Sequence, residues 1–453
     1  MLTRRGFAGL TALTGAAFAA AAHAQSTSGR RAEVEALRRF AETTHPRGRE
    51  AAIDADWRAR WEALAGEADT LGDGAYFHRS RAALGWFKDG HTTVLPFEFT
   101  GGVPAQLASG PFAVSLPLRV RLFHDGAYVV AAKDEAAHLL GARVTHVGGN
   151  SVEDLIRAWA RDWPGNDAWA HRWAGHAVTP AFLQALGAVA DARAPLTIEA
   201  HNGRRSVRAT LRPRANGSEA LQSLDHTQTQ AEAWAAQTGF GNFAWALPEH
   251  RALYLSVDDM ADIEGKTFEA FTHEAFAAME DTRADRLVID LRRNGGGNNF
   301  LMEPLRKRIL RSHFNRAGGL YVLTSPMTFS AAQNPCTRLE RDSFVLFVGE
   351  PTGGAPNHEG DAQPFVGEAT GLTSIVSTLR WYDSYPMDDR VWIMPDLLHP
   401  LTFADWRAGR DLALQAALTH EAPASDELDR ARIFFYRRPS QEQAWAPFWR
   451  PAS

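Results

Sequence analysis

Residues Arg286-Leu-Val-Ile-Asp290-Leu-Arg-Arg-Asn294-Gly-Gly-Gly297 decide the fold of this chain. The run at 287–291 is almost wholly apolar, which is typical of a strand that is buried on both faces. The three glycines that follow let the backbone approach a ligand closely, and such a loop can direct N–H groups at a developing oxyanion. Taken alone, the run also fits a phosphate loop or a tight turn. It lacks the Lys-Ser/Thr of a nucleotide P-loop, which argues against ATP or GTP.

Strands and helices alternate on both sides of this run. We expect strands at 252–257, 320–323 and 344–348, and helices at 266–279, after 297 to about 310, and from 329. This rhythm predicts an α/β core. Upstream, short strands are expected at 127–132, 141–147, 196–200 and 207–211, with a helix at 151–159. Helical spacing of apolar residues covers 30–65 and 75–87, and a short strand follows at 92–95.

The N-terminus has the composition of an export signal. Arg4 and Arg5 precede an apolar run at 10–22, and Ala22-His23-Ala24 offers small residues for cleavage. We therefore predict a twin-arginine signal peptide at 1–24, a mature chain that begins at Gln25, and a periplasmic location. The apolar run is about half of the roughly 20 residues that a spanning helix needs, so no stable membrane insertion is expected after cleavage.

Bulk composition excludes several classes of protein. The formal net charge is −5, and no basic patch or charge block predicts a nucleic-acid partner. Cys336 is the only cysteine, so no intrachain disulfide can form. No HExxH, paired CxxC or calcium-loop pattern is present, and we expect neither a metal nor another cofactor.

Two further segments carry candidate chemistry. In Leu323-Thr-Ser-Pro-Met-Thr-Phe-Ser330 a strand reaches a turn and then a helix, so that the serine stands where the helix dipole and backbone N–H groups favour a nucleophile. The same position also suits a plain N-cap serine. His91 lies in Asp89-Gly90-His91-Thr92, and a lone histidine is more often a surface or core residue than a base.

Together the three segments resemble the tail-specific, or C-terminal processing, peptidase family. The resemblance covers about residues 84–414. It rests on the Asp-Leu-Arg-x-Asn-x-Gly-Gly turn, on Thr-Phe-Ser330-Ala, and on the Gly-Glu-Pro-Thr-Gly-Gly run at 349–354. Pro395-Asp396 and the Gly-Arg-Asp run at 409–411 match the end of that domain. Leu140 to Val144 and Val147 to Val152 are similar to the carboxylate-binding region of a PDZ-like module.

The chain departs from the bacterial members of the family in its base. Those enzymes place a lysine after the glycine of the Gly-x-x-Thr-x-Gly segment, where this chain has Gly354 and Ala355, and its last lysine is Lys307. The resemblance is therefore to the tricorn-core branch, in which a histidine before the PDZ-like module activates the serine. It implies Ser330 as nucleophile, His91 as base, and Gly296 and Ala331 as oxyanion donors. For the relay acid it implies Asp389, with Asp388 and Asp383 as competitors, although Gly90 replaces the branch's serine beside the histidine.

The resemblance implies an α/β fold with a crotonase/ClpP-like catalytic core, a PDZ-like β-rich module and an N-terminal helical subdomain. The expected segments are the helical subdomain at 25–100, the PDZ-like module at 110–214, a linker at 215–240, the core at 241–420 and an extension at 421–453. The implied function is a serine peptidase that acts on peptide or protein substrates. Two alternatives stay open. The first is an inactive homologue that binds a peptide C-terminus or an apolar ligand; retinoid-binding proteins that resemble this family bind apolar ligands. The second is another hydrolase, such as an esterase.

Overall fold

The computed structural model describes residues 29–217, 220–239, 241–263, 265–281, 283–421 and 439–450. The chain divides into two compact units. Of the described residues, unit 1 holds those in 226–358 and 381–446, and unit 2 holds those in 29–225, 359–380 and 447–450. The predicted export signal at 1–24 lies outside the described residues.

Unit 1 is built on a six-stranded sheet in the order β11-β12-β13-β14-β15-β20. The four strands from β12 to β15 and the short β20 are parallel, and β11 pairs antiparallel with β12. The sheet confirms the α/β core expected from the sequence. The strands are β11 (Phe243–Leu247), β12 (Ala252–Ser256), β13 (Arg286–Asp290), β14 (Leu320–Thr324), β15 (Leu346–Gly349) and β20 (Leu397–Leu398).

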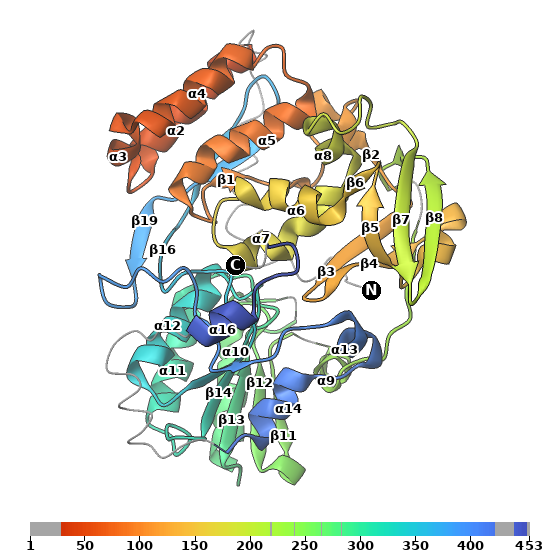
Figure 1. Ribbon diagram of the computed structural model, residues 1–453. Coiled ribbons are helices and arrows are strands. Elements are labelled where there is room, and N and C mark those ends of the chain that lie inside the picture. The colour runs from red at the N-terminus through yellow and green to blue at the C-terminus, as the bar shows by residue number, and fades with distance from the viewer. Residues whose placement is uncertain are drawn as a thin grey trace. The chain divides into compact units, whose positions relative to one another are not determined.

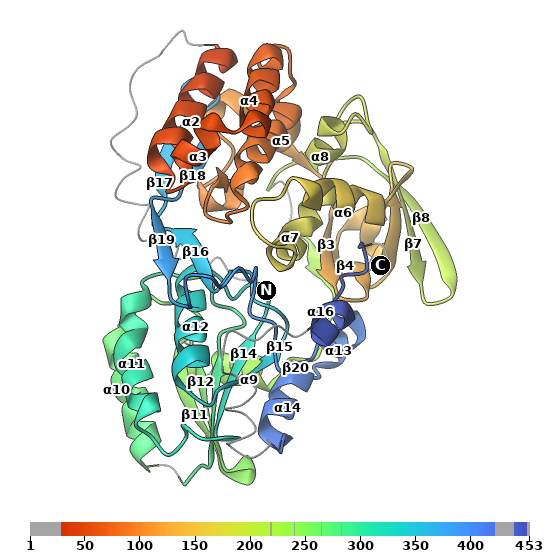
Figure 2. The ribbon, with the colours of Figure 1, turned by 60° about the vertical axis from the view of Figure 1, so that its left-hand side comes forward.

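Helices cover both faces of this sheet (Figure 1, Figure 2). Alternate residues of each strand point to opposite faces, so an almost wholly apolar strand needs cover on both. One face carries Leu287 and Ile289 into a core with α10 (Phe268–Asp281), α11 (Glu303–Leu310) and α12 (Gln333–Asp342). The other carries Val288 into a core with α9 (Gln230–Thr238) and α14 (Leu412–Thr419).

Unit 2 contains the predicted N-terminal helices. They are α2 (Arg30–Thr44), α3 (Gly48–Ile53), α4 (Ala55–Glu67) and α5 (Asp73–Leu84), and their buried side chains, led by Trp57 and Trp61, form one core. The predicted short strand is β1 (Thr93–Val94), at the edge of a three-stranded sheet with β18 (Thr373–Val376) and β17 (Gln363–Val366).

The remainder of unit 2 is rich in antiparallel strands. A seven-stranded sheet has the order β10-β4-β5-β7-β8, with β3 on β4 and β6 on β5. Its strands are β3 (Leu118–Phe123), β4 (Gly126–Ala132), β5 (Arg143–Val147), β6 (Asn150–Ser151), β7 (Leu196–Asn202), β8 (Arg205–Leu211) and β10 (Gln222–Ser223). The helix α6 (Val152–Arg161) begins at Ser151, whose hydroxyl accepts the Asp154 N–H as the expected N-cap, and α7 (Asp167–Trp173) and α8 (Pro180–Ala185) follow.

The units do not follow the expected segment boundaries. The segments predicted as a helical subdomain and a PDZ-like module both fall in unit 2. Residues 359–380, predicted as part of the core, also belong to unit 2, because β18 pairs with β1 at Thr93↔Ile375 and Val94↔Ser374. The linker predicted at 215–240, with one short helix, does contain such a helix, α9, which packs on the sheet of unit 1.

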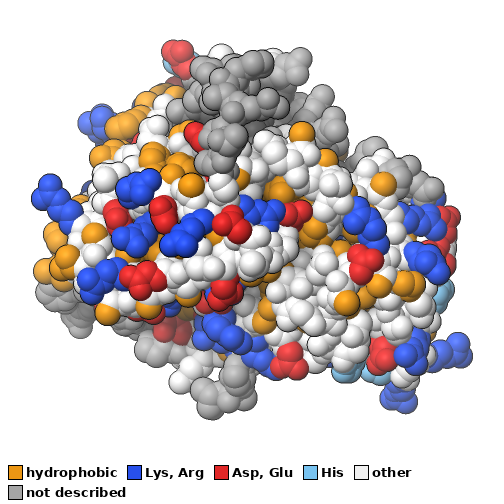
Figure 3. Space-filling model, turned by 90° about the horizontal axis from the view of Figure 1, so that it is seen from above, with side chains coloured by type: hydrophobic (Ala, Val, Ile, Leu, Met, Phe, Trp, Pro, Cys, Tyr) orange, Lys and Arg blue, Asp and Glu red, His pale blue; other side chains and the backbone are white. Residues whose placement is uncertain are grey.

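The face of the molecule in Figure 3 mixes basic and acidic side chains without a large field of one sign. Several of the ion pairs on the helices of unit 2 join such neighbours, for example Arg38 with Glu42 and Arg60 with Asp56. Across the described ranges, no helix is both long and apolar enough to cross a membrane. In the same ranges, no group of three or more His, Cys, Asp or Glu side chains is arranged to hold a metal ion.

Candidate active site

The glycine turn after β13 is held in shape by Asn294. This side chain is fully buried, donates from Nδ2 to the Val257 carbonyl at 2.8 Å, and accepts the Gly296 N–H on Oδ1 at 2.8 Å. Its own carbonyl accepts the Phe329 N–H at 3.3 Å. Asn294 therefore joins the glycine turn to the segment that ends at Ser330, which explains why an amide side chain suits this position.

Ser330 stands in a conformation that serines seldom adopt. Its φ is +55°, in the left-handed region, which costs a non-glycine residue roughly 1–2 kcal/mol. It begins the short helix η11 (Ser330–Ala332), which leads into α12, and the N-cap of η11 is Phe329, without a side-chain cap bond. The N-cap explanation of this serine is therefore wrong. Backbone strain of this kind is concentrated at active sites.

Gly296 lies directly against Ser330. A Cβ atom placed on Gly296 would come within 2.6 Å of Ser330 Cβ and 3.0 Å of Ser330 Oγ. The φ of Gly296 is +122°, which independently excludes a side chain. Glycine is required here because the turn and the serine approach more closely than any side chain allows.

The structure changes the role expected of Gly296. Its N–H already donates to Asn294 Oδ1, so it is not a free oxyanion donor as the chain stands. Its contribution is the missing side chain beside Ser330. Ala331, the other expected donor, is the second residue of η11. The first N–H groups of a helix have no partner within the helix, which fits the donor role expected of Ala331.

The segment before Ser330 is tied to the carboxyl ends of the neighbouring strands. The Thr328 hydroxyl donates to the Leu291 carbonyl, just after β13, at 2.9 Å. The Thr328 carbonyl accepts the Gly353 N–H, in the loop after β15, at 3.0 Å. The Ser325 hydroxyl donates to the Arg292 carbonyl at 2.7 Å. Three adjacent loops thus meet at the carboxyl edge of a parallel sheet, where open α/β folds bind their ligands.

A buried ion triad fixes the base of the glycine turn. The Arg292 guanidinium contacts Asp290 at 2.6 Å and Asp411, the N-cap of α14, at 2.7 Å. Tyr254 donates to Asp290 at 2.7 Å. Burial opposes ionisation of Asp290, but the charge and hydrogen bonds of Arg292 outweigh it and hold the pKa of Asp290 at about 2. The triad is structural, since these side chains bind one another.

His91 belongs to unit 2, in the turn before β1. Its Nδ1 lies 3.6 Å from Asp89 Oδ1, and its backbone N–H donates to the same oxygen at 2.9 Å. The Asp89 carboxylate is buried and also accepts the hydroxyls of Thr92 and Ser377, each at 2.6 Å on Oδ2. The carboxylate that contacts His91 within unit 2 is thus Asp89, two residues before it in the quoted motif. No pattern in the sequence favoured Asp89 over a distal acid.

The three predicted relay acids belong to unit 1. Asp383 accepts from Asn334 and from Arg338, the latter at 2.8 Å. Asp388 pairs with Arg390 at 2.8 Å and accepts the Ser384 hydroxyl. Both side chains are buried and engaged in their own unit, which disfavours a relay role, whereas the third, Asp389, is exposed.

Another histidine of the sequence, His358, lies buried in β16 (Asn357–Gly360), and its Nδ1 is 3.1 Å from the Ala355 carbonyl. At the place of the family's lysine, the backbone of Gly354 packs closely against Gln333. A Cβ atom placed on Gly354 would lie 3.1 Å from Gln333 Cβ. The position after it is alanine, so this segment supplies no basic side chain.

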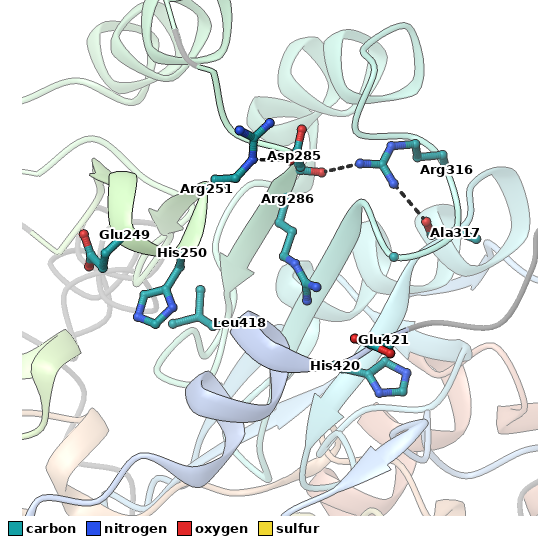
Figure 4. A pocket seen from close by; sticks show the side chains of 11 residues that line it. Glu249, His250, Arg251, Asp285, Arg286, Arg316, Ala317, Leu418, His420 and Glu421 are labelled. Carbon is teal, nitrogen blue, oxygen red and sulfur yellow. Dashed lines mark hydrogen bonds and ion pairs between the residues drawn. The ribbon is translucent and has the colours of Figure 1, made fainter.

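A separate pocket of about 530 Å³ lies at the opposite edge of the same sheet. Figure 4 shows that Arg251, Asp285 and Arg286 line it, and these residues stand where β12 and β13 begin. Arg251 pairs with Asp285, and Arg286 donates to the Ala417 carbonyl at 3.1 Å. Its charged side chains balance, with three arginines facing Glu249, Asp285 and Glu421. Neither Ser330 nor the glycine turn lines this pocket, so it is not the candidate active site.

Comparison with solved structures identifies the fold. The chain is similar to mature CPAF with a TM-score of 0.56 and 13% identity, over 86% of this chain and 96% of that chain. Mature CPAF complexed with lactacystin gives a TM-score of 0.55 and 13% identity, over 86% and 97%. This chain has the fold of mature CPAF.

A lower similarity, with a TM-score of 0.37 and 13% identity, relates 82% of the chain to 94% of the photosystem II D1 C-terminal processing protease. No family model matches the chain, and no curated protein matches its sequence. The fold shared with mature CPAF confirms the predicted resemblance at the level of the fold.

Proposed function

We propose that this chain is an exported serine peptidase that cleaves peptide bonds through an acyl-enzyme on Ser330, with His91 as the general base. The observation that carries the proposal is the conformation of Ser330. A strained, half-buried serine stands at the carboxyl edge of the sheet, against a glycine whose side chain is excluded. The fold shared with mature CPAF supports the same conclusion.

The mechanism follows from elementary nucleophile chemistry. A serine hydroxyl is weak at neutral pH and needs a base within hydrogen-bond reach. His91 removes the Ser330 proton, Ser330 attacks the carbonyl carbon, and His91 returns the proton to the leaving amine. Water then releases the acyl group. The Ala331 N–H stabilises the oxyanion, with a second donor from the glycine turn, where Gly296 contributes if it exchanges its bond to Asn294 for the substrate oxygen.

The pairing of Ser330 with His91 is itself part of the proposal, since the two residues belong to different units. No lysine follows Lys307, so the alternative base of the family is missing from the Ser330 segment. For the orienting acid, Asp389 is the candidate from sequence position, and Asp89 is the candidate from its contacts with His91. The crotonase/ClpP-like description of unit 1, the PDZ-like description of residues 110–214 and periplasmic export by the twin-arginine route are parts of the same proposal.

The decisive experiment is labelling with a fluorophosphonate probe, followed by peptide mapping. We expect one labelled residue, Ser330, and no labelling in Ser330→Ala. His91→Ala and the double variant are expected to lose similar peptidase activity, because residues that act as a unit are non-additive. Folded protein that binds peptides but is neither labelled nor active would replace the peptidase proposal with a binding function. Labelling of another serine would make the chain a different hydrolase.

A further inference from the structure

Asp89 is a buried carboxylate of unit 2 that accepts several hydrogen bonds. Three hydrogen bonds reach its two oxygens: Oδ1 accepts the His91 backbone N–H, and Oδ2 accepts the hydroxyls of Thr92 and Ser377. The imidazole Nε2 of His45 lies 3.5 Å from Oδ2. Its relative exposure is only 4%. Such a carboxylate needs these donors, because burial without them would neutralise it.

The imidazole of His45 has a fixed orientation. His45, the C-cap of α2, is buried and stacks on Phe87 with ring centroids 3.7 Å apart. Its Nδ1 accepts the Arg47 N–H at 3.0 Å, so that nitrogen carries no proton. A neutral imidazole then carries its proton on Nε2, and this nitrogen lies 3.5 Å from Asp89 Oδ2. His45 therefore presents a donor to the carboxylate.

The Nδ1 atom of His91 lies 3.6 Å from Oδ1, the other carboxylate oxygen of Asp89. A proton held on Nδ1 by a carboxylate leaves Nε2 as the basic nitrogen, which is the arrangement that an acid–base–nucleophile triad requires. Burial raises the pKa of Asp89, but hydrogen bonds from His45 and His91 and the charge of His91 together hold it well below its usual range. The carboxylate is thus ionised over the pH range in which a histidine acts as a base.

We infer that Asp89 is the acid that orients His91, and that His45 is a positioning residue that holds Asp89 from the opposite side. This inference rests on the proposed function, because it assigns supporting roles around the proposed base. Asp89 provides, from within unit 2, the polar side chain that supports the base. Gly90, beside the base, has no side chain and cannot provide it. The residues that hold the base in position then all come from the segment 45–92 and from Ser377.

The other charged groups near this cluster are neutralised among themselves. Arg47 lies 3.5 Å from Glu359, and Arg380 donates to the same carboxylate at 2.6 Å. Within the described part of unit 2, the ionisable side chains that contact Asp89 are thus the two imidazoles, His45 and His91. A change in kcat on removing the Asp89 charge is therefore attributable to the histidines.

The test compares Asp89→Asn and Asp389→Asn, the two candidate acids, with the control Asp56→Asn in the full mature chain, each with a thermal melt. The amide introduced by Asp89→Asn retains an oxygen for the His91 N–H but loses the charge. We expect kcat at neutral pH to fall on the order of 10³-fold or more, with a small change in KM, as loss of a triad acid does. The loss should fall on kcat rather than on KM or the melting temperature, as the role of a positioning acid requires. Asp56→Asn, which changes an exposed carboxylate on α4, should behave as wild type.

A second pair of variants covers the case in which Asp89→Asn does not fold. His45→Gln keeps an N–H donor, whereas His45→Leu removes it. We expect His45→Gln to retain most activity and His45→Leu to lose on the order of 10-fold in kcat. The ring nitrogen shifts of His91, read by NMR, should report the Nδ1-protonated tautomer in the wild type and should lose this preference in Asp89→Asn, independently of turnover.

The outcomes separate this inference from the proposed function. If Ser330→Ala and His91→Ala abolish activity while folded Asp89→Asn retains wild-type kcat, the assignment of Asp89 is overturned and the peptidase proposal stands. The same holds if Asp389→Asn carries the loss instead. If Ser330→Ala remains fully active, the proposed function itself fails.

Discussion

Replacing Gly296 with alanine tests the close approach between the glycine turn and Ser330. The new Cβ would lie 2.6 Å from Ser330 Cβ, on a backbone with φ of +122°. The backbone conformation costs an alanine about 1–2 kcal/mol, and relief of the overlap costs about 1–3 kcal/mol, so the free energy of unfolding should fall by about 2–5 kcal/mol. At roughly 2–4 °C per kcal/mol for a domain of this size, the melting temperature of unit 1 should drop by about 4–20 °C.

The catalytic loss should exceed the loss of stability. The overlap is relieved only if Ser330 or the turn shifts, and a displacement of about 1 Å at a reacting group costs on the order of 10²-fold in rate. The rate of fluorophosphonate labelling measures this directly, beside a thermal melt. Gly295→Ala is the matched control, because its Cβ would meet only the flexible end of the Met327 side chain, 2.7 Å from Cε. Wild-type labelling and melting in Gly296→Ala would refute the reasoning, as would an equal defect in Gly295→Ala.

Three further outcomes are expected. The pKa of Asp290 is about 2 in the folded protein against an ordinary 3.8, so its ionised carboxylate stabilises the fold above about pH 4, and this contribution is lost as the pH falls. The difference in unfolding free energy between wild type and Asp290→Asn should therefore narrow by about 2 kcal/mol from about pH 5 to below about pH 2. Urea unfolding measures this difference. Burial raises the pKa of the Cys336 thiol and encloses its side chain, so iodoacetamide should alkylate Cys336 only after unfolding, and mass spectrometry decides this. Mass spectrometry of periplasmic protein should find Gln25 at the N-terminus, and an intact precursor in the cytosol would contradict the export prediction.

The sequence was most informative where burial is decided locally. The apolar runs at 287–291 and 320–323 predicted β13 and β14 to within one residue at each end, because strands covered on both faces leave a continuous apolar signal. The Ser151 cap likewise located the start of α6, since capping is a local hydrogen bond. The helices α7 and α8 were not predicted, because the Trp-rich segment around 167–185 has apolar residues on more than one face.

The pairing of strands that are distant in the sequence could not be predicted from local sequence patterns. The strand β17 has mixed exposure and little apolar periodicity, and β18 pairs with β1 although Thr93 and Ile375 are 282 residues apart (375 minus 93). The segment between 359 and 380 was therefore assigned to the core by sequence continuity. Nothing in the neighbourhood of residue 93 or residue 375 signals that they meet.

The candidate site divides in the same way. Ser330 and the glycine turn were predicted by motif, but the left-handed backbone of Ser330 and the bond from Gly296 to Asn294 depend on the folded loops. Asp89 stood within the quoted motif, yet its role depends on Ser377 and His45, which reach it from distant parts of the chain. A carboxylate two residues before a histidine is otherwise explained as a local turn.

Residues 359–380 belong to unit 2 although they follow most of unit 1 in the sequence, and this limits how the gene can be divided or recombined. Neither unit is a contiguous stretch of gene: a fragment that ends at 225 lacks β17 and β18, and a fragment that begins at 226 carries them without β1. Recombination that exchanges one end of the gene therefore separates β1 from β18 and Asp89 from Ser377. The proposed nucleophile and its proposed base are consequently expected to be passed on together, and a two-piece version of the protein should regain activity only when both fragments are present.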